Sequence, residues 1–380
     1  MQGQAETRLL RLQNWRWSIG LESIKMIKKY KEFDWILLGV AAAIFIIGLL
    51  FLFSATYSKN IDFIIRQIAW FLIGALFFMV IININYRKII SLGYIFYFFS
   101  LILLLIVFFF GSKRLGAQRW LELGYFNLQP SEFAKLFITL ALIQYLTAQK
   151  SEKGIKNIVT AFFIMLAPFV LILAQPDLGT ALMLVPVFFT LLYIWGIRLK
   201  HLFFIIGGGL AASPLGWFLL KDYQKERLMV FMNPDIDPLG AGYTVIQSRI
   251  AIGSGGAFGK GWLSGTQNQL NFLTERHTDF IFSVAGEEWG FAGGIILIGL
   301  YYILVRRAFE IARKTDDPCG VLAACGMATI IGIQVIVNIS MTMGFMPVVG
   351  LPLLLVSYGG SSLLVTMIAL GLLESIAIHR

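Results

Sequence analysis

Residues 253–290 read GSGGAFGKGWLSGTQNQLNFLTERHTDFIFSVAGEEWG, a glycine-rich and polar stretch that runs directly into an apolar helix. Charged or ionisable groups gather ahead of that helix: Lys260, Glu275, Arg276, His277 and Asp279. Polar groups at the edge of a membrane span are costly unless they face a partner or a water-filled cavity. The stretch therefore predicts a membrane fold with a working surface at one edge.

The rest of the chain has the composition of a helical membrane protein. Its 380 residues are 58% hydrophobic and include 33 phenylalanines, and the mean hydropathy is +0.79. Apolar runs of membrane-spanning length recur along the sequence, which excludes a soluble fold. An all-α polytopic protein is expected, with ten helices at residues 34–54, 64–82, 89–110, 133–148, 158–174, 178–195, 201–220, 280–305, 321–341 and 353–378.

The bias of Lys and Arg in short loops predicts how these helices are oriented. Residues 1–33 hold seven Lys/Arg and form a basic segment on the cytoplasmic side. The basic loops after helices two, four, six and eight then lie inside, and both termini are cytoplasmic. Residues 34–380 form the membrane domain, with a large extracytoplasmic loop at 221–279. The net charge of +10 reflects these inner loops and affinity for anionic lipid rather than nucleic acid.

One stripe of the eighth helix concentrates unusual chemistry. Asp279, Ser283 and Glu287 are four residues apart and share a helix face, which predicts a water-accessible cleft with Asp279 at its outer mouth. A carboxylate placed there can accept a proton from an attacking sugar hydroxyl, while nearby cations stabilise a departing diphosphate. A purely structural interpretation has equal support from these residues: Asp279 caps the helix, and Glu275 pairs with Arg276.

Other polar positions add to this hypothesis. Asp177 follows Gln-Pro and would cap the next helix or face the site, and Lys135, three residues after Glu132, would pair with one of the stripe carboxylates, Asp279 or Glu287. Glycines between residues 240 and 265 would let the backbone approach a ligand closely. Three histidines predict no His-based metal site, although Mg²⁺ or Mn²⁺ held by diphosphate oxygens and a carboxylate stays an alternative. The candidate cations are Lys113, Arg114, Arg119, Arg249, Lys260 and Arg276.

Four long motifs occur in a fixed order along the chain. They are GAQRWLELGYFNLQPSEFAKL (116–136), QPDLGTA (175–181), GTQNQLNFLTERHTDFIFSVAGEEWG (265–290) and GFMPVVGLPLLLVSYGGSS (344–362). Together they resemble the signatures of the SEDS family (shape, elongation, division and sporulation), and the ERHTDF form resembles the RodA branch rather than the FtsW branch. The sequence departs from the family pattern at Thr274, Trp289 and Leu354.

The resemblance implies a ten-helix peptidoglycan glycosyltransferase of the bacterial cytoplasmic membrane. Such a protein polymerises lipid II by inverting transfer, releases undecaprenyl diphosphate and serves rod-shape elongation. The family's catalytic aspartate maps onto Asp279, as the general base of an extracytoplasmic active site. The substrate-binding positions expected from the resemblance are Arg119, Lys260, Glu275, Arg276, His277 and Thr278. The positions expected to support the cavity are Glu132, Lys135, Asp177, Ser283 and Glu287.

The implied partners are a class B penicillin-binding protein that supplies transpeptidation, lipid II, and other membrane proteins of the elongation complex, with no nucleic acid. Two alternative functions use the same residues. A flippase would carry a lipid-linked cell-wall precursor across the bilayer, and a non-catalytic scaffold would only position the penicillin-binding protein. The sequence leaves open whether the chain serves elongation or sporulation.

Overall fold

The computed structural model describes residues 32–57, 61–114, 117–123, 126–149, 154–240 and 242–380, so the predicted basic segment 1–33 lies almost wholly outside the described residues. Eight of the described helices are long and apolar enough to cross a membrane. These helices are α2 (Trp35–Thr56), α3 (Asp62–Asn83), α5 (Gly93–Phe110), α7 (Ile155–Ala174), α8 (Leu178–Trp195), α13 (Ile281–Arg313), α14 (Pro318–Thr342) and α15 (Gly360–His379).

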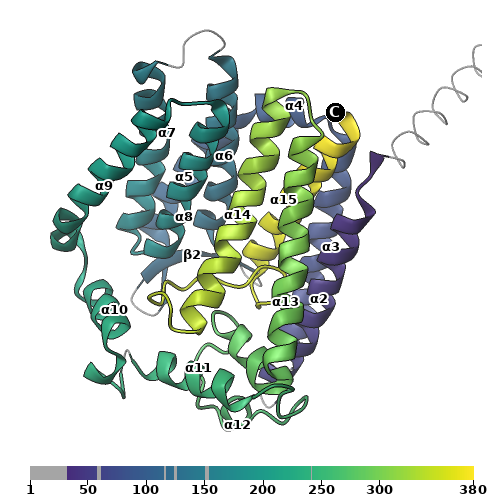
Figure 1. Ribbon diagram of the computed structural model, residues 1–380, viewed down its shortest axis with the longest axis vertical. Coiled ribbons are helices and arrows are strands. Elements are labelled where there is room, and N and C mark those ends of the chain that lie inside the picture. Colours follow the sequence, from purple (N-terminus) through teal and green to yellow (C-terminus); the bar gives the residue numbers. More distant parts are fainter. Residues whose placement is uncertain (1–31, 58–60, 115–116, 124–125, 150–153, 241) are drawn as a thin grey trace, which may run out of the picture.

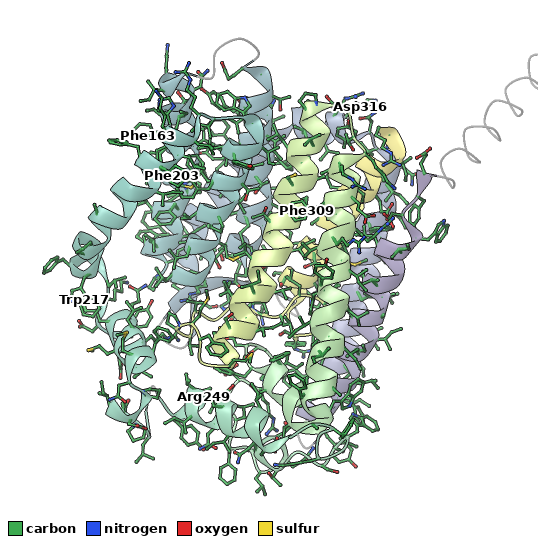
Figure 2. The ribbon with its side chains drawn as sticks, in the orientation of Figure 1. Phe163, Phe203, Trp217, Arg249, Phe309 and Asp316 are labelled. Carbon is green, nitrogen blue, oxygen red and sulfur yellow. The ribbon has the colours of Figure 1, made fainter. Side chains whose placement is uncertain are left out.

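Two further long helices, α6 (Pro130–Ala148) and α9 (Leu199–Leu219), correspond to the other two predicted spans. α6 is less apolar because it carries Glu132 and Lys135, and both of these side chains are buried. α9 leans outward from the bundle, and its Phe203 is 70% exposed (Figures 1 and 2).

The bundle is built around its C-terminal helices. Buried residues make up 89% of the apolar window of α15 and 72% of that of α14, against 17% for α3. α15 packs along α3, while α14 lies between α13 and α8 (Figure 1). The central helices can therefore place polar groups where lipid does not reach them.

Short elements gather at one end of the bundle, opposite the short helix α4 (Tyr86–Ser91) and the C-terminus (Figure 1). Within the predicted loop 221–279 the chain forms α10, η1, α11 and α12. The bounds of these elements are α10 (Asp222–Met232), η1 (Pro234–Ile236), α11 (Tyr243–Ser254) and α12 (Thr266–Gln269).

A small antiparallel sheet lies at this same end, and the sequence interpretation missed it. It comprises β1 (Ser112–Arg114), β2 (Ala117–Leu123) and β3 (Phe126–Leu128), in the order β1-β2-β3. Strands this short give little periodic signal, because hydrogen bonds between neighbouring strands rather than local propensity hold them. The sheet carries Arg119 to the vicinity of α8.

The predicted start of the tenth helix, at residue 353, was wrong. α15 begins at Gly360, and the segment 350–357 before it is irregular but largely buried. Its backbone carbonyls find side-chain partners, as buried polar groups must. Asn338 Nδ2 donates to the Leu351 carbonyl (2.7 Å), Gln334 Nε2 donates to that of Pro352 (3.0 Å), and the Tyr301 hydroxyl donates to that of Leu354. Gln334 and Asn338 of α14 thus hold this irregular segment.

Candidate active site

A cavity of about 270 Å³ opens at the end of the bundle that carries α10 and α11. Its walls come from α10, α11, the loop before α13 and the segment 344–348. Regions far apart in sequence therefore meet here, which is the usual origin of a ligand site. The polar residues that line it are Arg227, Thr244, Arg249, Thr274, Glu275 and Asp279.

The loop that carries Asp279 is held by its backbone. Asn338 Nδ2 donates to the Asp279 carbonyl (2.9 Å), the backbone N–H of Tyr358 donates to the His277 carbonyl (2.8 Å), and the Ser357 hydroxyl donates to the Thr278 carbonyl. The irregular segment before α15 is thus the support on which the loop rests. Among the described residues, no hydrogen bond or ion pair reaches the carboxylate oxygens of Asp279, which face the cavity.

The surroundings of Asp279 favour its neutral form more than water would. Burial raises the pKa of Asp279 to about 6, and the negative charge of Glu275 adds to the rise, while Arg227 and Arg119 oppose it. A carboxyl group with a pKa near 6 is largely ionised at neutral pH and is still basic enough to accept a proton. The predicted role of Asp279 as a base at a cavity therefore has matching geometry and electrostatics.

Glu275 lies at the rim of the same cavity in a conformation that L-residues rarely adopt. Its φ is 49°, and its carboxylate accepts a hydrogen bond from the Thr278 hydroxyl (3.1 Å). Next to it, the hydroxyls of Thr274 and Thr244 are 2.7 Å apart and connect the loop to α11. Of the predicted substrate contacts His277 and Thr278, neither lines the cavity; the His277 ring packs against Phe63 and Tyr358.

Arg119 and Asp177 lie beside the cavity, near Arg227, which lines it. Arg119 lies 3.7 Å from the Asp177 carboxylate and also donates to the Pro176 carbonyl. Asp177 caps α8 by accepting from the Thr180 N–H (3.3 Å), so the capping interpretation is confirmed, and the same carboxylate also faces an arginine.

Arg227 is a site residue that the sequence interpretation missed. It lies on α10, and its Nη1 donates to the Val348 carbonyl (3.1 Å). Burial and the neighbouring charge of Arg119 lower the pKa of Arg227. The only sequence signal was Tyr223 four residues earlier, which places an aromatic ring and a cation on one helix face; the guanidinium lies 5.7 Å from that ring.

The prediction that Lys135 pairs with Asp279 or Glu287 was wrong, because its carboxylate partner is Glu132, inside the bundle. Lys135 Nζ lies 2.9 Å from Glu132 and 2.7 Å from the Gln334 side-chain oxygen, and both charged residues are 2% exposed. Gln334 in turn holds the segment before α15. Neither member of this pair lines the cavity.

Lys260, Ser283 and Glu287 do not line the cavity, and the prediction of an open cleft along the stripe of Asp279, Ser283 and Glu287 was wrong beyond Asp279. Ser283 and Glu287 are fully buried. Glu287 pairs with Lys260 (2.8 Å) and also accepts from the Thr266 hydroxyl (3.1 Å), while Ser283 contacts the Ser248 hydroxyl (2.6 Å). The cause is the glycine-rich loop, which folds over this face of α13.

Arg276 is also structural in its contacts. It is buried, its Nε donates to the Ala55 carbonyl (2.8 Å), and its Nη1 donates to the Asn268 carbonyl. It therefore ties the loop before α13 to α2 rather than lining the cavity. The expected surface ion pair between Glu275 and Arg276 does not form, since Arg276 points into the protein. No cluster of three or more metal-binding side chains occurs among the residues that the structure describes.

The fold and the site together define a polytopic helical membrane protein with an acid- and arginine-lined cavity at one end. Residues 34–380 match the FtsW/RodA/SpoVE family of cell cycle proteins, and the chain belongs to this family. Peptidoglycan glycosyltransferase MrdB of Escherichia coli K12 is 40% identical, over 90% of this chain and 93% of that protein. Peptidoglycan glycosyltransferase RodA of Treponema pallidum is 35% identical, over 92% and 98%.

A solved structure shows the same architecture. A chain from a peptidoglycan synthase complex, described as coordinating polymerization and crosslinking, superposes with a TM-score of 0.79 at 36% identity, over 91% of this chain and 97% of that one. The resemblance inferred from the four motifs is thus confirmed over nearly the whole chain after residue 34.

Proposed function

We propose that this chain is a peptidoglycan glycosyltransferase of the rod-shape elongation machinery, which polymerises lipid II with Asp279 as general base. The observation that carries the proposal is the Asp279 carboxylate, which faces a cavity that also contains Arg227. Relatives over nine-tenths of the chain are named peptidoglycan glycosyltransferases, which supports the same reaction.

In the proposed reaction, Asp279 accepts the proton of the attacking sugar hydroxyl. The hydroxyl oxygen forms the new bond to the anomeric carbon of the second substrate, and the bond from that carbon to the diphosphate oxygen breaks. Undecaprenyl diphosphate leaves with the electron pair, and the cations Arg119 and Arg227 stabilise its charge. The pKa of about 6 supports this role, because Asp279 is ionised at neutral pH before the hydroxyl arrives.

We propose ten membrane crossings in the bacterial cytoplasmic membrane, with α6 and α9 added to the eight apolar spans. The basic loops lie in the cytoplasm together with both termini, and the cavity faces outward. Support comes from the separation of the two ends: α10 and α11 lie at the end with the cavity, whereas Asp316 of a basic loop lies at the opposite end (Figure 2).

A class B penicillin-binding protein is the proposed partner for crosslinking. The supporting observation is the similar chain from a synthase complex whose description joins polymerization and crosslinking. Other membrane proteins of the elongation machinery belong to the same proposal, and nucleic acid does not.

The test is polymerisation of purified lipid II by this chain with its class B partner. Native protein should make glycan strands, Asp279→Asn should make none, and the control Asp222→Asn, at an exposed acid of α10, should act like native protein. Equal polymer from the native and Asp279→Asn proteins would remove Asp279 from the chemistry. A native protein that makes no polymer but moves lipid II across vesicle membranes would establish the flippase alternative.

A further inference from the structure

A second, smaller cavity of about 70 Å³ adjoins the first. It lies between α8, α10 and the segment 347–349, and it shares Arg227, Pro347 and Val348 with the larger cavity. Arg119 lines it as well, whereas Asp279 does not. The shared wall means that Arg227 faces both spaces.

The two arginines of this wall are like charges, and the charge of Asp279 acts on both. Asp177 lies 3.7 Å from Arg119, and the two guanidinium groups also donate to the carbonyls of Pro176 and Val348. Like charges that approach each other in a partly buried wall repel, and a bound dianion would relieve this repulsion. Two guanidinium groups beside one cavity suit a diphosphate, whose oxygens they can contact in pairs.

Apart from Tyr223 and Gln224, the remainder of the smaller cavity is apolar. Leu178, Leu182 and Leu228 line it, and Leu182 is 47% exposed on α8, one of the helices suited to cross the membrane. A cation pair at one end and an apolar path toward a lipid-facing helix at the other match a molecule with a diphosphate head and an isoprenoid tail.

The opposite side of the larger cavity has a different character. Arg249 of α11 lies there at the surface (Figure 2), and its side chain packs over Gly344, where an added Cβ would lie 3.0 Å from Arg249 Cδ. Within the described part of the chain, Arg249 forms neither an ion pair nor a hydrogen bond. The hydroxyls of Thr244 and Thr274 line the same side. This side is open and polar, without the apolar path of the smaller cavity.

We propose that the two cavities hold two lipid-linked substrates in a fixed order, the donor on the α8–α10 side at Arg119 and Arg227, and the acceptor on the α11 side at Arg249. The inference rests on the proposed function and adds the direction of transfer. The diphosphate that leaves is the one held by Arg119 and Arg227. Asp279 takes the proton of an acceptor hydroxyl that arrives from the α11 side, and Arg249 holds an anionic group of that acceptor, either its diphosphate or a carboxylate of its stem peptide.

The order is tested by transfer from a labelled lipid-linked glycan, as donor, to lipid II, as acceptor, with the two substrates varied separately. Arg249→Ala should raise the lipid II concentration for half-maximal rate by about tenfold or more, with the donor dependence changed less than threefold. Arg227→Ala should raise the donor concentration for half-maximal rate by about tenfold or more, with the lipid II dependence changed less than threefold. Arg227→Lys should restore part of the donor dependence of the native protein. Lys225→Ala, on α10 outside both cavities, is the control. A lipid II analogue without the stem peptide separates the two anionic groups: an unchanged Arg249→Ala effect assigns the diphosphate, and a lost effect assigns the peptide.

Binding of undecaprenyl diphosphate tests the order without turnover. Its Kd should rise about tenfold or more in Arg227→Ala and less than threefold in Arg249→Ala, because only the first residue adjoins the apolar path. Equal weakening by both variants, or substrate effects opposite to those above, would overturn the order. If the native protein does not polymerise lipid II, the proposed function fails, and the binding comparison still decides which side holds the lipid diphosphate.

Discussion

Two carboxylates at the start of α13, which the sequence places on one helix face, lie in opposite environments. Asp279 lies half-buried at the cavity, and among the described residues its carboxylate has no hydrogen-bond partner. Glu287, two turns later, is fully buried and accepts from Lys260 (2.8 Å) and from the backbone N–H groups of Gln267 (2.9 Å) and Asn268 (3.2 Å). The two residues look alike in sequence, yet one is available for chemistry and the other is not.

The difference lies in what covers each carboxylate. The glycine-rich loop lies directly on α13, where the N–H groups of Lys260 and Gly261 donate to the carbonyls of Glu287 and Glu288 (3.0 Å each). That loop supplies the donors that neutralise Glu287, and it ends short of Asp279. A buried charge with many donors holds structure together, whereas a charge with few donors at a cavity can bind and react.

The largest expected effect separates the two carboxylates by activity. Asp279→Asn should lower the polymerisation rate by about 100-fold to 10,000-fold, because an amide cannot accept the proton. Its unfolding temperature should stay near that of the native protein, since no partner is lost. The polymerisation assay measures the rate, and thermal unfolding in detergent measures the unfolding temperature. A folded Asp279→Asn protein with the native polymerisation rate would show that Asp279, like Glu287, takes no part in the chemistry.

The second prediction concerns Glu287. Glu287→Gln should reduce the free energy of unfolding by about 3 kcal/mol, because it leaves Lys260 without its charge partner and turns an amide toward buried N–H donors. Denaturant unfolding measures the loss. The double variant with Lys260→Met should recover part of it. A native unfolding curve combined with lost activity would instead place Glu287 in the chemistry.

A third prediction tests the loop that covers Glu287. Gly259 has φ 81°, and an added Cβ would lie 2.1 Å from the Glu288 carbonyl. Gly259→Ala should therefore cost about 2 kcal/mol of stability through backbone strain and displacement of the loop. Gly299→Ala is the control, because its Cβ would meet no atom within 4 Å. Equal unfolding temperatures for the two variants would show that close approach to α13 does not matter.

The smallest effect concerns pH. Since Asp279 must be ionised to act, the rate should rise with pH through about 6. Glu275→Gln removes a negative charge that raises the pKa of Asp279, so the rise should move to lower pH, by less than about one unit. The pH dependence of the rate at low substrate measures this shift. A move to higher pH would show that Glu275 does not act on Asp279 through its charge.

Much of the helical framework could be predicted because lipid imposes a simple rule. A span must be long, apolar and hydrogen-bonded within itself, so the apolar runs mark most helices to within a few residues. The rule failed at 353–359, which are mostly apolar but not helical. Side chains of other helices hold this stretch and the two residues before it: Tyr301 donates to the Leu354 carbonyl, and Gln334 and Asn338 donate to those of Pro352 and Leu351. The rule also gave no indication of the sheet 112–128.

The candidate site divides in the same way. The motif around Asp279 and the charges of Arg119 and Asp177 could be recognised, since these residue types are rare beside apolar helices. The partners of Lys260 and Arg276 could not be predicted from the sequence. Each side chain donates to acceptors on segments that are distant in the chain. Arg227 was missed because a single arginine on a polar helix looks like an ordinary surface residue.

The sequence by itself therefore determined the membrane class, the approximate spans and the family, and it proposed Asp279 as the candidate base. Only the tertiary structure decided which charged groups meet at the cavity. Hydropathy is a property of each residue alone and does not depend on how the chain folds. Whether a charge is compensated depends on donors brought from distant segments, such as the glycine-rich loop at Glu287 and the α10 arginine near Asp279.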